Sequence, residues 1–157
     1  MRRTLYSSAM RALKRLQRKV TNLALLIIIL WAAYQFFWAR HLYTITAYCN
    51  CPICINIPEY YDGKFASGKK VYWGGVAADS SVPVGAKVEL VPNSPLDFFD
   101  IYFLLKGRFN YRVEDRGGKI KGRHIDLYIP QSLGGHKKAL AWGRRRMRIK
   151  INGRLAD

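Results

Sequence analysis

The stretch VEDRGGKIKGRHIDLYIP, residues 113–130, places a basic, glycine-rich loop between two strand-like segments. Apolar, β-branched and aromatic side chains dominate residues 109–114 and 125–129, so each segment predicts a short strand. One aspartate, Asp115, follows the first strand, and another, Asp126, lies inside the second. The loop between them could fold back, which would bring both carboxyl groups to one site with cations for an acidic substrate.

Further strands are predicted on both sides of this stretch. The segments that alternate or are rich in β-branched and aromatic residues are 43–48, 71–78, 87–91 and 144–151. Residues 98–105 could pair with 109–114 as a hairpin, and 136–142 predicts one short helix that ends at Gly143. Several short strands at this spacing favour a small barrel, so residues 41–157 predict one mainly-β domain.

The N-terminal part predicts a membrane anchor. Residues 1–19 carry seven basic side chains and no acidic one, and residues 20–39 carry no charge. Twenty helical residues span roughly 30 Å, the thickness of the hydrocarbon core of a bilayer. An uncleaved signal anchor is favoured over a cleaved signal peptide, which would need a small-x-small site after the apolar run, and over a buried core helix. The basic arm then lies in the cytoplasm, and the outer domain is periplasmic or extracellular.

The whole chain has 157 residues and a formal net charge of +17. This length excludes a large multidomain enzyme, and the apolar and aromatic content excludes an acidic disordered chain. So high a charge suggests a nucleic-acid partner. Seven of the charges belong to the basic arm, however, one is Arg40, and nine belong to residues 41–157. We therefore expect no nucleic-acid partner, a lipid bilayer around residues 20–39, and acidic cell-envelope polymers around the outer domain.

Three cysteines form a C-x-C-x-x-C cluster: Cys49, Cys51 and Cys54. A disulfide or free thiols are expected before a metal site, because tetrahedral zinc needs a fourth ligand and the three histidines are scattered along the chain. We expect no bound metal and no cofactor, with the cysteine cluster as the one place where a metal could bind.

Residues 43–151 resemble the three-aspartate (3D) domain of stationary-phase survival proteins and of the C-terminus of membrane-bound lytic transglycosylase A. The matching segments, in order, are TAYCNCPIC (46–54), GKFASGKKVYWGGVAAD (63–79), VPVGAKV (82–88), VEDRGGKIKGRHIDLYIP (113–130) and HKKALAWGRRRMRIKI (136–151). The resemblance implies a six-stranded double-psi β-barrel. It also implies cleavage of the β-1,4 bond between N-acetylmuramic acid and N-acetylglucosamine in peptidoglycan, with a 1,6-anhydro sugar as product.

The resemblance implies roles for three aspartates. Asp126 matches the catalytic acid, Asp115 would be its charged neighbour, and Asp79 would complete the site. One carboxyl group can serve as general acid and then as base, because the sugar's own C6 hydroxyl replaces water as the nucleophile. The substrate-binding residues expected from the matching segments are Ser67, Gly117, Gly118 and Lys121.

Two departures from the family pattern bear on function. An insert at about residues 92–112 could be a hairpin, a lid over the glycan, or a membrane- or partner-facing element. The pair Asp115-Arg116 stands where the family usually has Asp-Thr, and a cation next to Asp115 is expected to hold it ionised. The alternatives to a lytic transglycosylase are a non-catalytic glycan-binding module of the same fold, a membrane-surface or assembly protein, and an ordinary glycoside hydrolase.

Overall fold

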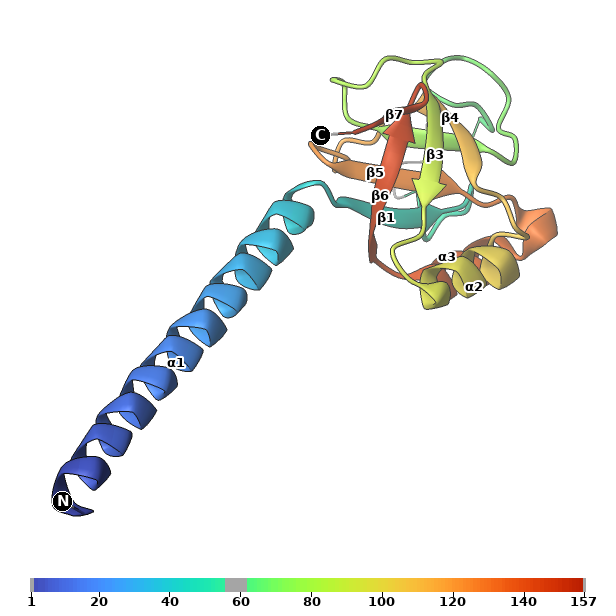
Figure 1. The fold of residues 1–157 in the computed structure, drawn as a ribbon. Coiled ribbons are helices and arrows are strands. Elements are labelled where there is room, and N and C mark those ends of the chain that lie inside the picture. The colour runs from blue at the N-terminus through green and yellow to red at the C-terminus, as the bar shows by residue number, and fades with distance from the viewer. Residues whose placement is uncertain (1, 56–61, 157) are drawn as a thin grey trace. The chain divides into compact units, whose positions relative to one another are not determined.

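The structure is a computed structural model, and it describes residues 2–55 and 62–156, without the side chains of residues 2–13, 35 and 37–40. The chain divides into two units, Met1–Arg40 and His41–Asp157. The first is a single helix, α1 (Arg2–Arg40), drawn in blue in Figure 1. Its segment Lys14–Tyr34 is apolar and long enough to cross a membrane, and none of it is buried. The side chains of Phe37 and Trp38, two aromatic residues near the end of this apolar segment, lie outside the described residues.

The second unit is a closed barrel. Its strands run in the order β1-β5-β2-β4-β3-β6, and β6 pairs with β1 to close the ring. The strands are β1 (Tyr43–Tyr48), β2 (Gly75–Ala78), β3 (Lys87–Val91), β4 (Asn110–Asp115), β5 (His124–Tyr128) and β6 (Arg145–Ile151), with a short β7 (Arg154–Leu155) on β6. The strand expected at 71–78 begins only at Gly75.

The strand pairings have an internal two-fold symmetry. If β1, β2 and β3 are exchanged with β4, β5 and β6, the parallel pair β1–β5 becomes the parallel pair β4–β2. In the same way the antiparallel pair β3–β4 becomes β6–β1, and the pairs β2–β5 and β3–β6 map onto themselves. This is the double-psi arrangement, so the predicted six-stranded barrel is confirmed.

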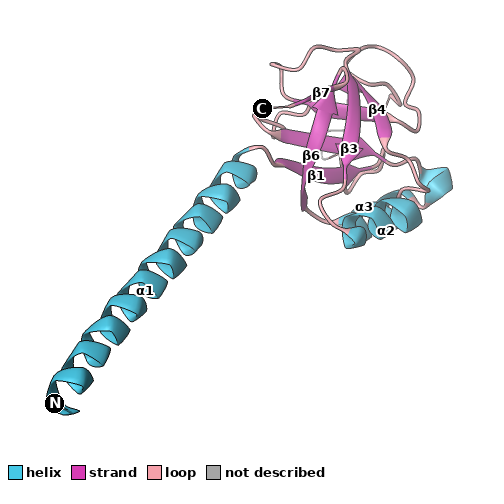
Figure 2. Cartoon of the chain, in the orientation of Figure 1, coloured by secondary structure: helices cyan, strands magenta, loops and turns pink. Residues whose placement is uncertain are grey.

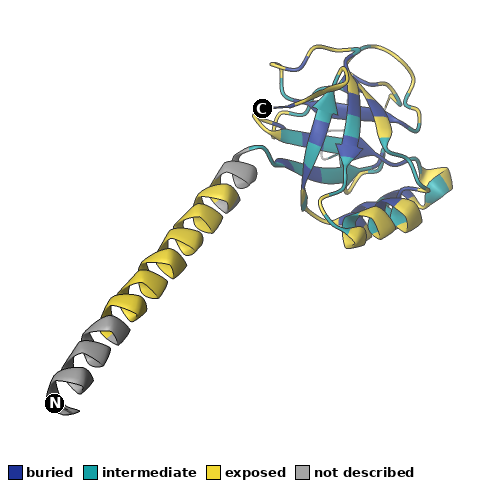
Figure 3. Ribbon diagram, in the orientation of Figure 1, coloured by how far each residue is buried: buried dark blue, intermediate teal, exposed yellow. Residues whose placement is uncertain are grey.

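Alternate residues of the strands fill the barrel. The fully buried side chains include those of Ile45, Val113, Leu127, Met147 and Ile149, and Figure 3 shows the buried segments concentrated in the strands. Each such side chain contributes about 1.5–3 kcal/mol through burial of apolar surface. The residues between them face outward, which leaves the outer face of the strands free to carry polar groups.

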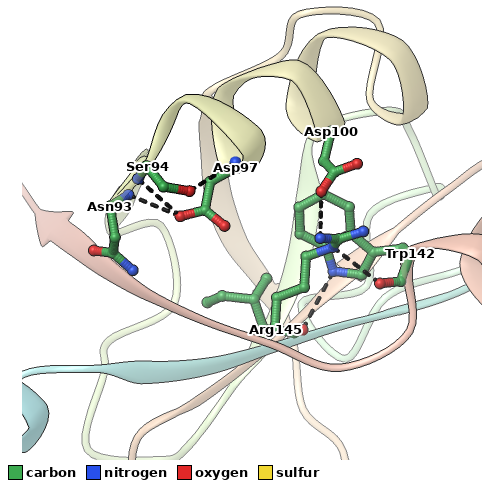
Figure 4. Close-up of polar contacts among 7 residues, drawn as sticks. Asn93, Ser94, Asp97, Asp100, Trp142 and Arg145 are labelled. Carbon is green, nitrogen blue, oxygen red and sulfur yellow. Dashed lines mark hydrogen bonds and ion pairs between the residues drawn. The ribbon is translucent and has the colours of Figure 1, made fainter.

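The insert forms a helix, so the hairpin expected over residues 98–105 is wrong. Helix α2 spans Pro95–Leu104. Its first turn is held by a reciprocal capping box, in which Ser94 Oγ accepts from the Asp97 N–H at 3.2 Å and the Asp97 carboxylate accepts from the Ser94 N–H at 3.1 Å (Figure 4). Ile101 is buried in the core and fixes the inner side of the helix.

The predicted helix at 136–142 is confirmed as α3 (Gly135–Trp142), capped by Gly143. Helices α2 and α3 contact each other, α3 also packs on β1, and both lie outside the barrel (Figure 2). Trp142 is buried and donates its indole N–H to the Ile45 carbonyl at 3.2 Å. The Arg145 guanidinium lies over the Trp142 ring, and it pairs with Asp100 of α2 (Figure 4). These contacts tie the two helices to the start of β6.

Candidate active site

One row of residues crosses four neighbouring strands on the outer face of the barrel. Thr46 on β1 pairs with Asp126 on β5, Asp126 pairs with Ala77 on β2, and Ala77 pairs with Asp115 on β4. Residues directly opposite one another in a sheet share a face. The two aspartates are therefore two strands apart, with roughly 10 Å between their backbones. Ala77, which lies between them, has a short side chain and is buried.

A bulge in β4 brings Asp115 into this row. Val113 pairs with Val76, but the next pair is Asp115 with Ala77, so Glu114 is an extra residue on its strand. In a regular strand, Val113 and Asp115 would both point into the barrel. The extra residue re-aims the side chain of Asp115, which thus shares the outer face with Asp126.

Asp126 is half-buried and accepts a short hydrogen bond. The Thr46 hydroxyl donates to its Oδ1 at 2.6 Å, and His124 Nε2 lies 2.8 Å from the same hydroxyl oxygen. Because the only proton of Thr46 is directed to Asp126, His124 donates to Thr46. Burial raises the pKa of Asp126 to about 6; the hydrogen bond from Thr46 opposes this shift, and the Asp115 charge adds to it. Burial also lowers the pKa of His124, which keeps its ring neutral.

Asp115 accepts three hydrogen bonds that fix it in place. The Tyr48 hydroxyl donates to Oδ2 at 2.5 Å, and the backbone N–H groups of Ala66 and Arg116 each donate to Oδ1 at 2.9 Å. Burial, together with the Asp115 charge, raises the pKa of Tyr48, so this hydroxyl remains a donor. The cation expected beside Asp115 is directed elsewhere, because the Arg116 guanidinium donates to the carbonyls of Ala78, Val82 and Asp115.

Aromatic rings support this end of the site. Tyr128 contacts Tyr48 edge to face, and Phe65 contacts both Tyr128 and Tyr72 in the same way, each pair with ring centroids 5.5 Å apart. Gly75 makes room for Phe65, since a Cβ at this position would lie 2.2 Å from the ring. The segment that carries Ala66 and Ser67 is thereby held against β2 and β5, next to Asp115.

Glu114 forms a second, buried acidic centre beside the row. Its carboxylate accepts from Lys69 Nζ at 2.7 Å and from the Tyr72 hydroxyl at 3.0 Å. Burial opposes ionisation, but the hydrogen bonds from Lys69 and Tyr72, together with the Lys69 charge, lower the pKa of Glu114. Glu114 therefore stays ionised, and its role is to hold the 65–72 segment on the barrel.

The remaining predicted site residues lie around the row. The Ser67 backbone N–H donates to the Glu114 carbonyl at 2.9 Å, one residue before Asp115. Gly117 sits against Ile120, where a Cβ would lie 2.5 Å from that side chain, and Gly118 is exposed. Lys121 is exposed on the same loop. Ser67 thus lies next to the strand that carries Asp115, Gly117 and Gly118 follow Asp115 along the chain, and Lys121 lies near Asp79. The roles of all four toward substrate stay predictions.

Asp79 is placed differently from the other two aspartates. It follows β2 and accepts the Ser81 backbone N–H at 2.9 Å. Hydrogen bonds from Ser81 and from the Gly122 N–H, helped by the Lys121 charge, lower the pKa of Asp79 to about 2. Asp79 is thus an ionised group that joins the turn after β2 to the 117–122 loop, and a part in catalysis stays a prediction.

Sequence reasoning missed Thr46, Tyr48 and His124 as members of the site. The period-two pattern of residues 43–48 contains a signal for two of them, because Thr46 and Tyr48 share the face opposite the buried Ile45. That they contact the two aspartates depends on the parallel β1–β5 register, which no local pattern shows.

The structure also corrects one expectation about the cysteines. Cys49, Cys51 and Cys54 are free thiols, and His136 joins them in one cluster. The scattered histidines gave no fourth ligand in the sequence, but α3 brings His136 to the end of β1 and beside the cysteines.

The chain was compared with known proteins. No protein-family model and no curated protein matches it. Solved structures of MltA from Escherichia coli are similar: an unliganded variant of this lytic transglycosylase (22% identity, TM-score 0.37), the protein with bound chitohexaose (24%, 0.38) and a further crystal structure (25%, 0.36). Each match covers 56% of this chain and 26% of the other, so this chain spans about a quarter of MltA.

Proposed function

We propose that residues 41–157 are a lytic transglycosylase domain that cleaves the β-1,4 bond between N-acetylmuramic acid and N-acetylglucosamine in peptidoglycan. The observation that carries this proposal is the state of Asp126. Its carboxyl group is half-buried, accepts a hydrogen bond from the Thr46 hydroxyl on Oδ1, and has a pKa raised to about 6. Such a group holds a proton in mildly acidic solution and can also accept one, as a single acid–base residue must.

The contacts of Asp126 suggest which oxygen acts. Thr46 occupies Oδ1, so the transferable proton is carried by Oδ2. Asp126 protonates the glycosidic oxygen as its bond to C1 of the muramic acid breaks. The C6 hydroxyl of the same sugar then attacks C1, and its proton passes to the Asp126 carboxylate. The product is a 1,6-anhydro end, and Asp126 recovers its protonated form without water taking part.

Asp115 supports both steps from across Ala77. Its negative charge stabilises the positive charge that develops at C1, and it also raises the pKa of Asp126. Its hydrogen bonds from Tyr48, Ala66 and Arg116 keep the carboxylate in a fixed position without neutralising it. Asp115 is therefore an electrostatic partner of Asp126 and not a second proton donor.

The surroundings of the row suit an anionic glycan. The 116–124 loop between the two aspartates carries Lys119, Lys121 and Arg123. Muramic acid bears a carboxylate-containing substituent, to which these cations are complementary. Ser67 and the backbone of Gly117 and Gly118 add polar groups at the same edge. We propose these residues as the substrate-binding set, and peptidoglycan strands as the partner.

Helix α1 supports a membrane-anchored location for this activity. We propose that it anchors the chain in a membrane, with the basic arm in the cytoplasm and the barrel on the side of the cell wall. The apolar segment and the basic residues that precede it support this orientation.

Purified sacculi test the proposed reaction. We expect the full chain in detergent to release muropeptides with 1,6-anhydro ends, and Asp126→Asn to lower the rate by at least about 100-fold, because an amide cannot donate the proton. Glu89→Gln is the matched control: Glu89 lies on β3, outside the row, and pairs with Lys150. Sedimentation with sacculi but no released product would instead support a glycan-binding module.

A further inference from the structure

The three cysteine side chains of the C-x-C-x-x-C cluster and the side chain of His136 converge on one point. The Sγ atoms of Cys49, Cys51 and Cys54 and a ring nitrogen of His136 all lie within 4.8 Å of one another. His136 Nδ1 is 3.4 Å from Cys54 Sγ and 3.8 Å from Cys51 Sγ, and Cys49 Sγ is 3.5 Å from Cys54 Sγ. Three thiols and an imidazole are a complete tetrahedral donor set.

Three of the four measured separations suit ligands around a shared ion. Bonds of about 2.3 Å from zinc to sulfur and about 2.0–2.1 Å to nitrogen imply ligand atoms roughly 3.5–3.8 Å apart in a tetrahedron. The Cys49–Cys54, Cys51–His136 and Cys54–His136 separations lie within about 0.3 Å of this range. The fourth, 2.8 Å between Cys49 and Cys51, is well beyond the length of a disulfide, and those two sulfurs need to part by about 1 Å to bind an ion.

The backbone around the cluster is built to hold these positions. Cys49 directly follows β1 and is buried. A tight turn then presents the other two thiols: the Cys54 and Ile55 N–H groups donate to the Cys51 carbonyl at 3.1 and 2.9 Å. This turn holds Cys51 and Cys54 close together.

The fourth donor, His136, lies on α3 directly after Gly135. A Cβ on Gly135 would lie 2.3 Å from Gln131 Oε1 and 3.4 Å from the Cys49 Cβ, and the φ of +26° at Gly135 disfavours other residues, so glycine suits this close approach. Gln131 Nε2 lies 3.5 Å from Cys49 Sγ as a donor, a contact that would stabilise a thiolate. The cluster therefore has an outer hydrogen bond as well as four ligands.

We propose that Cys49, Cys51, Cys54 and His136 bind one zinc ion in a closed, structural site. Thiolate sulfur and imidazole nitrogen in a tetrahedral arrangement suit Zn²⁺ better than the oxygen-preferring cations. With four protein ligands the ion has no open position, so its role is to join the end of β1 to α3. The site also fixes Tyr48, the residue before Cys49, which donates to Asp115.

Metal content measures the site directly and does not depend on enzymatic activity. We expect the full chain, purified in detergent without chelators, to carry about one zinc per chain, and Cys54→Ser and His136→Ala to carry less than about a tenth of that. Lys137→Ala is the matched control, because Lys137 is exposed on the same helix next to His136 and should leave the zinc content unchanged.

Cobalt replacement in the wild-type chain keeps the test valid if the variants fail to fold. Exchange of zinc for Co²⁺ is expected to give the visible absorption of tetrahedral cobalt with thiolate charge-transfer bands. Folded wild-type protein without metal, which neither takes up added Zn²⁺ nor gives this spectrum with Co²⁺, would overturn the proposal. A mass spectrum that shows a disulfide among the three cysteines in such protein would identify a covalent link in place of the ion.

Discussion

At the scale of single residues, the surroundings of Asp126 raise the pKa of its carboxyl group. Most carboxyl groups in proteins are exposed, because burial of the charged form is unfavourable. Here it lies half-buried between Thr46 and Ala77, and its pKa is raised to about 6. The neighbouring Asp115, with three donors, shares the same face. The two carboxyl groups thus have unequal environments, and the proposed function gives them unequal roles.

The raised pKa predicts that Asp126 destabilises the fold at neutral pH. The folded-state value of about 6 exceeds the ordinary value of 3.8, so the protonated form favours folding, and this contribution is lost as pH rises through about 6. At pH 7, Asp126→Asn should raise the free energy of unfolding by up to about 3 kcal/mol and raise the melting temperature by several degrees.

Thermal unfolding of the full chain at several pH values measures this effect. The difference between wild type and Asp126→Asn should shrink to nearly nothing below about pH 4, where both side chains are neutral. Glu89→Gln, a carboxyl-to-amide change outside the site, should not show this dependence. An Asp126→Asn variant that melts below wild type at pH 7 would mean that Asp126 is ionised and favourably paired in the folded protein.

At the scale of elements, the sequence predicts the strands better than the insert. The strands follow from alternation, as in Arg145–Ile151, where Met147 and Ile149 are buried and the basic residues between them are less so. Residues 98–105 are apolar on nearly every position, and so short an apolar run does not distinguish a strand from a helix. The deciding signal stands before it: Ser94, Pro95 and Asp97 are the cap, first position and capping-box partner of a helix.

The site was only partly predictable for a related reason. Asp115 and Asp126 follow from the motif, but their shared face depends on the bulge at Glu114. Alternation alone would turn Asp115 inward. His136 reaches the cysteines only through the position of α3 on β1, a packing that no local spacing contains.

The helix cap of α2 can be tested by itself. Ser94→Ala removes the oxygen that accepts the Asp97 N–H, so we expect a loss of about 1 kcal/mol in the free energy of unfolding. Denaturant unfolding of the full chain measures it, with Ser80→Ala, an exposed serine in a turn, as the control. Equal stability of Ser94→Ala and wild type would show that the cap contributes nothing.

At the scale of the whole molecule, the net charge of +17 separates into parts with different roles. The basic arm before the apolar segment of α1 supports orientation in a membrane, and the charge of residues 41–157 suits an anionic wall polymer.

The anchor predicts a simple fractionation result. We expect the full chain to float with phospholipid vesicles in a density gradient and to resist extraction by high salt, because the apolar segment Lys14–Tyr34 is held by burial in the bilayer and not by charge. A chain that lacks residues 1–40 should remain at the bottom of the gradient. If the shortened chain floats equally well, the barrel itself binds lipid, and α1 is not needed for attachment.

In the proposed reaction, Asp126 uses the sugar's own C6 hydroxyl in place of water. Digestion of sacculi by the full chain in heavy-oxygen water, with mass spectrometry of the released muropeptides, distinguishes the two nucleophiles. We expect 1,6-anhydro ends that contain no heavy oxygen, and their disappearance in Asp126→Asn. Reducing ends that carry heavy oxygen would instead mean that water attacks C1 and that the domain is an ordinary hydrolase.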